Sequence, residues 1–218
     1  MYQCQRYHIM EVVGKSKAHV VLESCLLDST DYFSDHHRIL KCNPYCKNID
    51  YHADLGIFQW TFEVEDPRKN PIVAIFFVRQ DVEHLPPGSD FLTKCATQDP
   101  KKSDKKEDNG GKLIRWISAE TVPDIRVESE NTFIGAADAE ICLVHLPENK
   151  TSVHFETNIT LDFKLSFPLN LMPEMVLKFM SETIMSQIMQ QATESMLCKV
   201  QADICCSDAD IAAKGELR

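Results

Sequence analysis

The chain has no long apolar run and no excess of basic charge. Its longest uninterrupted apolar run extends from Ile72 to Val78, far short of the roughly 20 residues that a membrane-spanning helix needs. The 23 Lys and Arg residues are outnumbered by 33 Asp and Glu residues, which gives a formal net charge of −10. An acidic chain repels the phosphate backbone of nucleic acids. We therefore expect no integral membrane segment and no nucleic-acid partner.

Signals for targeting and for common catalytic chemistry are also missing. The first residues, MYQCQRYHIM, contain neither the apolar core of a secretory signal nor the Arg- and Ser-rich composition of a transit peptide. We expect a cytoplasmic protein whose 9 cysteines are reduced thiols, because their number is odd and their spacing irregular. No GxSxG, HExxH, P-loop or GxGxxG motif occurs. We therefore expect no catalytic residues, no cofactor and no enzymatic activity.

The chain does contain a series of strand patterns. Apolar and polar residues alternate on both sides of Gly56, where the phase changes by one residue and indicates a bulge or a turn. The clearest alternation runs from Val153 to Phe167, where every odd position is apolar or Thr and every even position is polar. We expect strands over residues 17–27, 49–55, 58–64, 72–82, 112–122, 133–146 and 153–167.

Two helices are expected among these strands. A short one should begin at Asp28 or Ser29, either of which can cap it, and end before Pro44. The other is long, because no Gly or Pro interrupts the chain from Glu174 to Val200. Its apolar face should hold Leu177, Met180, Ile184, Met185, Ile188, Met189, Ala192 and Met196, with Glu182, Ser186, Gln190, Thr193 and Glu194 opposite.

The order of these elements predicts an α+β fold. A curved antiparallel sheet of about six or seven strands, wrapped around one long C-terminal helix, satisfies that order. Residues 17–204 should form a single helix-grip domain after an N-terminal extension, 1–16, and before a frayed or separately helical tail, 205–218. The charged segment 97–111 should be a mobile loop within this domain, because it has almost nothing to bury.

Residues Lys150 to Met189 carry a resemblance to a known superfamily. They include KTSV, the strand ITLDFKLSFPL and the helix PEMVLKFMSETIMSQIM, and FIGAAD from Phe133 and NPYC from Asn43 fit the same layout. In these features the chain resembles the START and Bet v 1-like (SRPBCC) superfamily, and is most similar there to a domain-of-unknown-function family of cyanobacteria, plants and algae. The resemblance implies a cavity for lipids, sterols, polyketides or other apolar ligands, and a plastid location for some relatives.

The first functional hypothesis is non-catalytic binding of a hydrophobic small molecule, a lipid or an isoprenoid-like compound. The flexible, polarisable methionines of the long helix suit a cavity wall, although ordinary core packing against the sheet is the more common reason for such a face. Members of the superfamily differ in activity, so the fold alone does not choose a function. The expected lining residues are Trp60, Phe62, Ile159, Leu161, Phe163, Met180 and Ile184.

Two further hypotheses stay open. An enzyme of polyketide-cyclase or hydratase type would need a titratable group in the cavity, with Asp138, His145 or His154 as candidates. A protein-interaction module would instead have a filled interior and an exposed apolar patch. The volume and polarity of the space between helix and sheet separate these hypotheses.

A metal site is the last alternative. Soft-metal ligands are present at His36, His37, Cys42, Cys46 and His52. Zinc sites usually show paired CxxC-like spacings, which these residues do not form. We therefore expect no metal.

Overall fold

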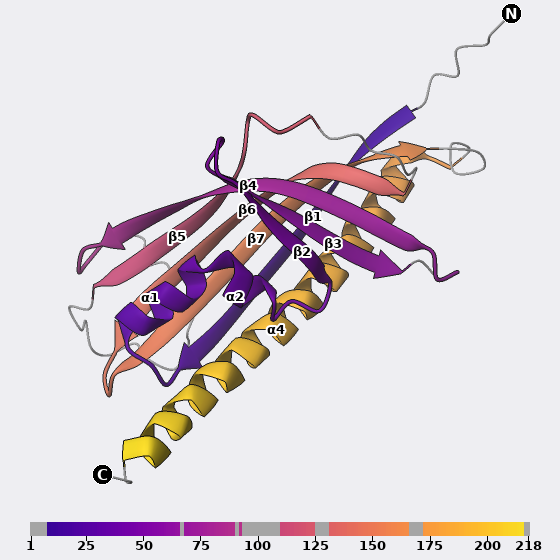
Figure 1. The fold of residues 1–218 in the computed structure, drawn as a ribbon. Coiled ribbons are helices and arrows are strands. Elements are labelled where there is room, and N and C mark those ends of the chain that lie inside the picture. The colour runs from indigo at the N-terminus through magenta and orange to yellow at the C-terminus, as the bar shows by residue number, and fades with distance from the viewer. Residues whose placement is uncertain are drawn as a thin grey trace, which may run out of the picture.

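A single curved sheet dominates the computed structural model, which describes residues 8–65, 68–89, 92, 110–124, 131–165 and 172–215. Within these ranges seven strands are joined in the order β1-β7-β6-β5-β4-β3-β2 (Figure 1). Neighbouring strands are antiparallel, and β4 also pairs in parallel with β6 beyond the end of the shorter β5. The strands are β1 (His8–Leu22), β2 (Cys46–His52), β3 (Ile57–Glu65), β4 (Pro71–Leu85), β5 (Gly111–Ser118), β6 (Thr132–Leu146) and β7 (Lys150–Leu165).

Helices accompany the sheet near both ends of the chain. The two short helices, α1 (Leu26–Ser34) and α2 (His36–Leu40), follow β1, and α4 (Glu174–Gly215) follows β7. Figure 1 shows α4, in orange to yellow, running alongside β1. None of the helices in the described part of the chain is both long and apolar enough to cross a membrane. The predicted α+β helix-grip fold is confirmed.

The first strand begins much earlier than predicted. β1 starts at His8 rather than Lys17, because β7 is long enough to pair with it from Leu165 back to Thr151. Residues 8–16 therefore belong to the sheet and not to an N-terminal extension. The strand also ends at Leu22, before the predicted end at residue 27. Likewise, β5 ends at Ser118 instead of residue 122.

The predicted short helix is divided in two, and its predicted caps are wrong. α1 is capped by Cys25, whose sulfur accepts a hydrogen bond from the amide of Asp28 at 3.4 Å. Asp35 adopts an extended conformation that ends α1, and its carboxylate accepts a hydrogen bond from the amide of Arg38 at 3.1 Å. This side chain therefore starts α2 immediately after α1 has ended.

The strand predicted over residues 49–55 is displaced by three residues, because β2 runs from Cys46 to His52. Gly56 closes the turn between β2 and β3 with a φ of 64°, a conformation that favours glycine. The long helix begins at Glu174 as predicted, but residues 205–215 continue it instead of forming a separate tail. Most of the predicted loop at 97–111 lies outside the described residues.

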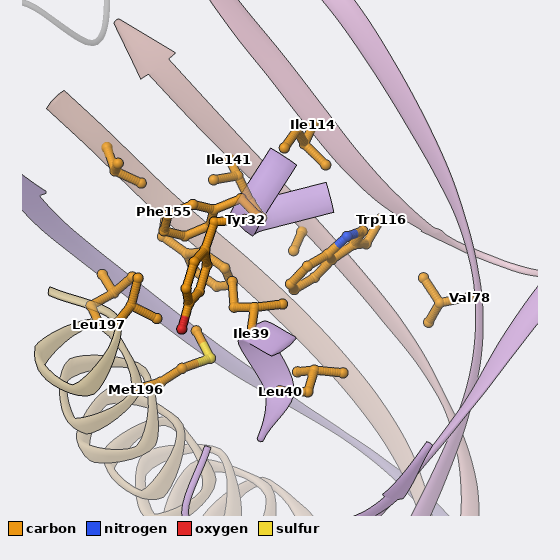
Figure 2. Packing of buried hydrophobic residues seen from close by; sticks show 14 of the residues in the cluster. Tyr32, Ile39, Leu40, Val78, Ile114, Trp116, Ile141, Phe155, Met196 and Leu197 are labelled. Atoms are coloured by element: carbon orange, nitrogen blue, oxygen red, sulfur yellow. The ribbon is translucent and has the colours of Figure 1, made fainter. Parts of the chain in front are cut away.

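The interior between α4 and the sheet is packed at one end. Figure 2 shows Tyr32 of α1 and Ile39 of α2 between Phe155 of the sheet and Met196 of α4. The hydroxyl of Tyr32 donates a hydrogen bond of 2.8 Å to the carboxylate of Asp203, which ties α1 to α4. Burial and this hydrogen bond raise the pKa of Tyr32 far above its ordinary value. The two short helices therefore fill the space near the C-terminal half of α4.

Candidate ligand cavity

Toward the other end of α4 the interior is hollow. A cavity of about 370 Å³ lies between the concave face of the sheet and the residues of α4 from Ser181 to Met196. The segment after α2 closes one side of it. The rest of the wall comes mainly from the sheet and includes Trp60, Phe62, Trp116, Ala137, Phe155 and Ile159.

The cavity wall carries no charge. Among the described residues that line it, none is Asp, Glu, Lys, Arg or His. An ionised ligand group inside this space would lose its hydration without meeting a counter-charge, which is strongly unfavourable. The cavity therefore suits an uncharged, mostly apolar molecule.

Two tryptophans contribute ring surface to the wall but no free N–H group. The rings of Trp60 and Trp116 meet edge to face, with centroids 5.0 Å apart. The indole N–H of Trp60 donates to Nδ1 of His36 at 3.1 Å, and that of Trp116 donates to the side-chain oxygen of Gln80 at 2.8 Å. Because both donors are used within the protein, this part of the wall offers a ligand only apolar contact.

His36 supports this wall without lining the cavity. Its side chain is only 1% exposed and stacks on Phe58 with ring centroids 3.8 Å apart. Burial lowers the pKa of His36 to about 4, and the Gln80 amide and the Asp35 carboxylate oppose that effect only in part. Since Nδ1 accepts the Trp60 hydrogen bond, Nε2 carries the proton of the neutral ring. Nε2 has no hydrogen-bond partner within the described residues.

A few polar groups remain available at the wall. The side-chain oxygen of Asn43 accepts a hydrogen bond from the amide of Tyr45 at 3.0 Å, which leaves the side-chain NH₂ group of Asn43 for a ligand. Within the described part of the chain, the hydroxyls of Tyr45 and Ser181 make no hydrogen bond, whereas Thr193 is bound to Ser16 at 2.7 Å. The cavity can thus satisfy one or two hydroxyl or carbonyl groups of a ligand.

The polar face of α4 positions the helix against the free edge of β1. The amides of Lys15 and Lys17 donate to the side-chain oxygens of Ser186 and Gln190, at 3.1 and 3.0 Å. The amide of Gln190 donates back to the carbonyl of Lys17 at 2.9 Å. Four residues of a helix span about 6 Å along its axis, and two residues of a strand span about 6.8 Å. Every fourth side chain of α4 can therefore reach every second residue of β1. The predicted polar face is therefore bound to the sheet edge.

A glycine lets the helix approach this closely. A Cβ atom on Gly14 of β1 would lie 2.6 Å from Sδ of Met189 and 2.7 Å from Cγ of Met185. Any other residue at this position would force the side chains of Met185 and Met189 to move. Gly14 therefore helps to set the distance between helix and sheet, on which the cavity depends.

The cavity opens beside an exposed apolar segment of α4. Ile184 lines the cavity and is still 54% exposed, so it lies at the opening. Large apolar side chains at the start of α4 and just before it precede Ile184 on the surface: Met172, Met175, Val176, Phe179 and Met180.

Six of the seven predicted lining residues lie on the cavity wall: Trp60, Phe62, Ile159, Leu161, Phe163 and Ile184. Met180 is not among the lining residues and is 49% exposed, because the wall formed by α4 begins one residue later, at Ser181. Their contact with a ligand stays a prediction. Phe155 was missed, although it has the same odd-numbered phase as Ile159, and Trp116 was missed because β5 shows no such alternation.

The candidates for catalysis lie elsewhere. Asp138 points away from the cavity and accepts a hydrogen bond from the amide of Ser118 at 3.0 Å. His154 stacks on His19 of β1, and His145 lies near the end of β6. None of the three lines the cavity.

The candidates for metal binding make separate contacts and do not form one cluster among the described residues. His52 contacts the side-chain oxygen of Gln59 at 3.0 Å, and His37 is exposed on α2. The thiol of Cys42 donates to the carbonyl of Arg38 at 3.8 Å. Burial raises the pKa of Cys46 to about 11, which opposes the thiolate form that binds metals.

No protein-family model matches the chain, and no curated protein matches it by sequence. Among solved structures, it is similar to the Zhui aromatase/cyclase from Streptomyces sp. R1128, with 10% identity and a TM-score of 0.49 over 90% of this chain and 94% of that one. A START superfamily protein from Mycobacterium smegmatis has 11% identity and a TM-score of 0.42, over 87% and 96%. The human StarD13 (DLC2) lipid transfer and protein localization domain has 12% identity and a TM-score of 0.39, over 79% and 72%.

Proposed function

We propose that this chain binds a neutral, mostly apolar small molecule, such as a lipid or an isoprenoid-like compound, and does not transform it. The observation that carries the proposal is the cavity of about 370 Å³ with no charged side chain among its described lining residues. Binding of an apolar molecule is compatible with membership of the START and Bet v 1-like superfamily. Within that superfamily we propose that the chain belongs to the domain-of-unknown-function family of cyanobacteria, plants and algae.

The volume limits the size of the ligand. A dry apolar cavity of roughly 150 Å³ holds a benzene molecule. By proportion, the 370 Å³ cavity holds about 15 non-hydrogen atoms. This is the size of a short lipid chain or a small isoprenoid alcohol, and it is too small for a diacyl lipid to enter completely.

Apolar burial alone can support useful affinity. Burying about 15 methylene-sized groups contributes roughly 12 kcal/mol. Lost translational and rotational freedom costs at least about 4 kcal/mol. The remainder is at most roughly 8 kcal/mol, which corresponds to a dissociation constant of about 1 μM or weaker. The side chains of Asn43, Tyr45 and Ser181 would then orient a polar end of the ligand.

The absence of catalysis is part of the proposal. A cyclase or hydratase needs an acid or a base within reach of the substrate. Asp138, His145 and His154 do not line the cavity. The described lining residues include no Asp, Glu or His that could serve as the acid or base instead. The hydroxyl of Tyr45 is the nearest substitute, and it has no neighbouring base on the wall.

The intrinsic fluorescence of the protein tests the proposal directly, because its 2 tryptophans, Trp60 and Trp116, both line the cavity. Titration with farnesol, an uncharged isoprenoid alcohol of suitable size, should change this fluorescence with micromolar affinity. Farnesyl diphosphate should bind much more weakly because its charges meet no partner. Native mass spectrometry of protein purified from its own source should show a retained neutral ligand.

Matched variants make the test specific to the cavity. Ala137→Phe places a ring in the cavity and should abolish farnesol binding. Ala136→Phe, on the opposite face of the same strand, should leave binding unchanged. Unaltered binding in Ala137→Phe, or chemical conversion of a bound compound, would overturn the proposal.

A further inference from the structure

A second cluster of functional side chains lies on the convex face of the sheet. His19 of β1 and His154 of β7 are directly opposite each other in the antiparallel register. Their rings stack with centroids 4.4 Å apart and an interplanar angle of 26°. Ser152 precedes His154 on the same face of β7. The cluster belongs to the two strands farthest from β2 and does not contribute to the cavity wall.

Both imidazoles direct the same nitrogen at one atom. Nε2 of His19 lies 2.9 Å from the hydroxyl oxygen of Ser152, and Nε2 of His154 lies 3.2 Å from it. Neutral imidazole nitrogens are common ligands of Zn²⁺ and Cu²⁺, which they bind at about 2.0–2.1 Å. The serine hydroxyl can turn away about its Cα–Cβ bond and leave room for a cation. Each imidazole would then need to move by about 1 Å to bring its Nε2 atom within bonding distance of that cation.

The surroundings suit a cation that exchanges with solvent. His19 is exposed, whereas His154 and Ser152 are each 7% exposed, so one side of the cluster is open and the other is held by the sheet. The chain as a whole carries a net charge of −10, which favours cations. Across the described residues, no three or more His, Cys, Asp and Glu side chains are grouped as a metal site. Two imidazoles would therefore supply the protein nitrogens, and the serine hydroxyl and water the rest.

We infer that His19 and His154 form a two-imidazole binding site for a divalent transition metal ion of the Zn²⁺ and Cu²⁺ class, with Ser152 at the third position. The inference is independent of the proposed cavity ligand, because the cluster and the cavity use different faces of the sheet. The pair was not among the metal candidates of the sequence. His19 and His154 are 135 residues apart, and only the register of β1 and β7 brings them together.

Nitrogen-15 NMR of the imidazole rings tests the site in the full chain. Addition of ZnCl₂ should shift the Nε2 signals of His19 and His154 and leave that of the exposed His37 unchanged. This readout separates the site from zinc that binds to cysteine thiols, which does not shift histidine nitrogens. Zinc titration monitored by calorimetry should include one site per chain that is lost when either of these rings is removed.

Variants complete the test. His19→Gln should weaken this zinc site by roughly tenfold or more and leave the fold intact, because the side chain is exposed. His154→Gln should do the same, and His37→Gln is the matched control that should bind zinc as the wild type does. Zinc shifts absent from both rings, or equal zinc affinity in wild type and His19→Gln, would overturn the inference.

Discussion

The buried histidine behind the cavity wall should make this protein sensitive to mild acid. His36 is neutral in the folded protein, and its pKa falls from 6.5 to about 4 because of burial. Between these two values the unfolded chain binds a proton that the folded protein does not. The free energy of unfolding is therefore unaffected by His36 above pH 6.5 and decreases as the pH falls from 6.5 toward 4.

The size of this effect follows from the two pKa values. A difference of about 2.5 units corresponds to about 3 kcal/mol at the low end of the window. At pH 4.5 most of it, about 2.5 kcal/mol, should already be lost. Protonation would also leave Nδ1 unable to accept the hydrogen bond from Trp60, so the tryptophan wall should loosen as His36 becomes charged.

Urea unfolding followed by tryptophan fluorescence, at pH 7 and at pH 4.5, measures the effect. His36→Asn provides the comparison, because its side-chain oxygen can accept the Trp60 hydrogen bond but does not titrate. This variant should be less stable than the wild type at pH 7, since it loses the stacking on Phe58. Its stability should then fall by about 2.5 kcal/mol less than that of the wild type between the two pH values.

The control is His37→Gln, which removes an exposed histidine next to the buried one. Its stability should depend on pH as the wild-type stability does. If His36→Asn loses as much stability between pH 7 and pH 4.5 as the wild type, the acid sensitivity does not come from His36 and the reasoning is refuted.

Three further predictions concern the position of α4 and the thiols. Gly14→Val should lower the free energy of unfolding by about 1–3 kcal/mol in urea, because its side chain overlaps the methionines of α4; unchanged stability would contradict this close contact. Gln190→Ala should cost about 1 kcal/mol through its lost hydrogen bonds to β1, whereas the exposed neighbour Gln191→Ala should change stability by less than about 0.5 kcal/mol. Iodoacetamide at pH 8, followed by peptide mass spectrometry, should modify exposed Cys198 faster than half-buried Cys46, whose pKa is raised to about 11 by burial; the opposite order would argue against that burial.

The long strand and the long helix could be predicted because their signals are local. Alternation from Val153 onward reflects the two faces of one extended segment, and the uninterrupted run after Glu174 reflects the backbone preferences of one helix. The break at Asp35 was not predictable in the same way. Both of its neighbours suit a helix, and the break depends on how α1 and α2 fit between the sheet and α4.

The candidate cavity was predictable in part. Odd-numbered residues of β7 had to share a face, and Ile159, Leu161 and Phe163 do lie on the cavity wall. The sequence could not show whether this face meets side chains or empty space, because a filled core and a cavity have the same apolar pattern. That distinction depends on the distance between α4 and the sheet.

By itself, the sequence determined the fold class, the apolar character of the inward faces and the absence of a long membrane-spanning run, because each follows from composition or from periodicity along one segment. Only the tertiary structure decided three other features. These are the uncharged cavity beside α4, the binding of the polar face of α4 to the edge of β1, and the stacking of His19 on His154. Each depends on residues far apart in the chain, and their relative positions are set by strand register and close packing.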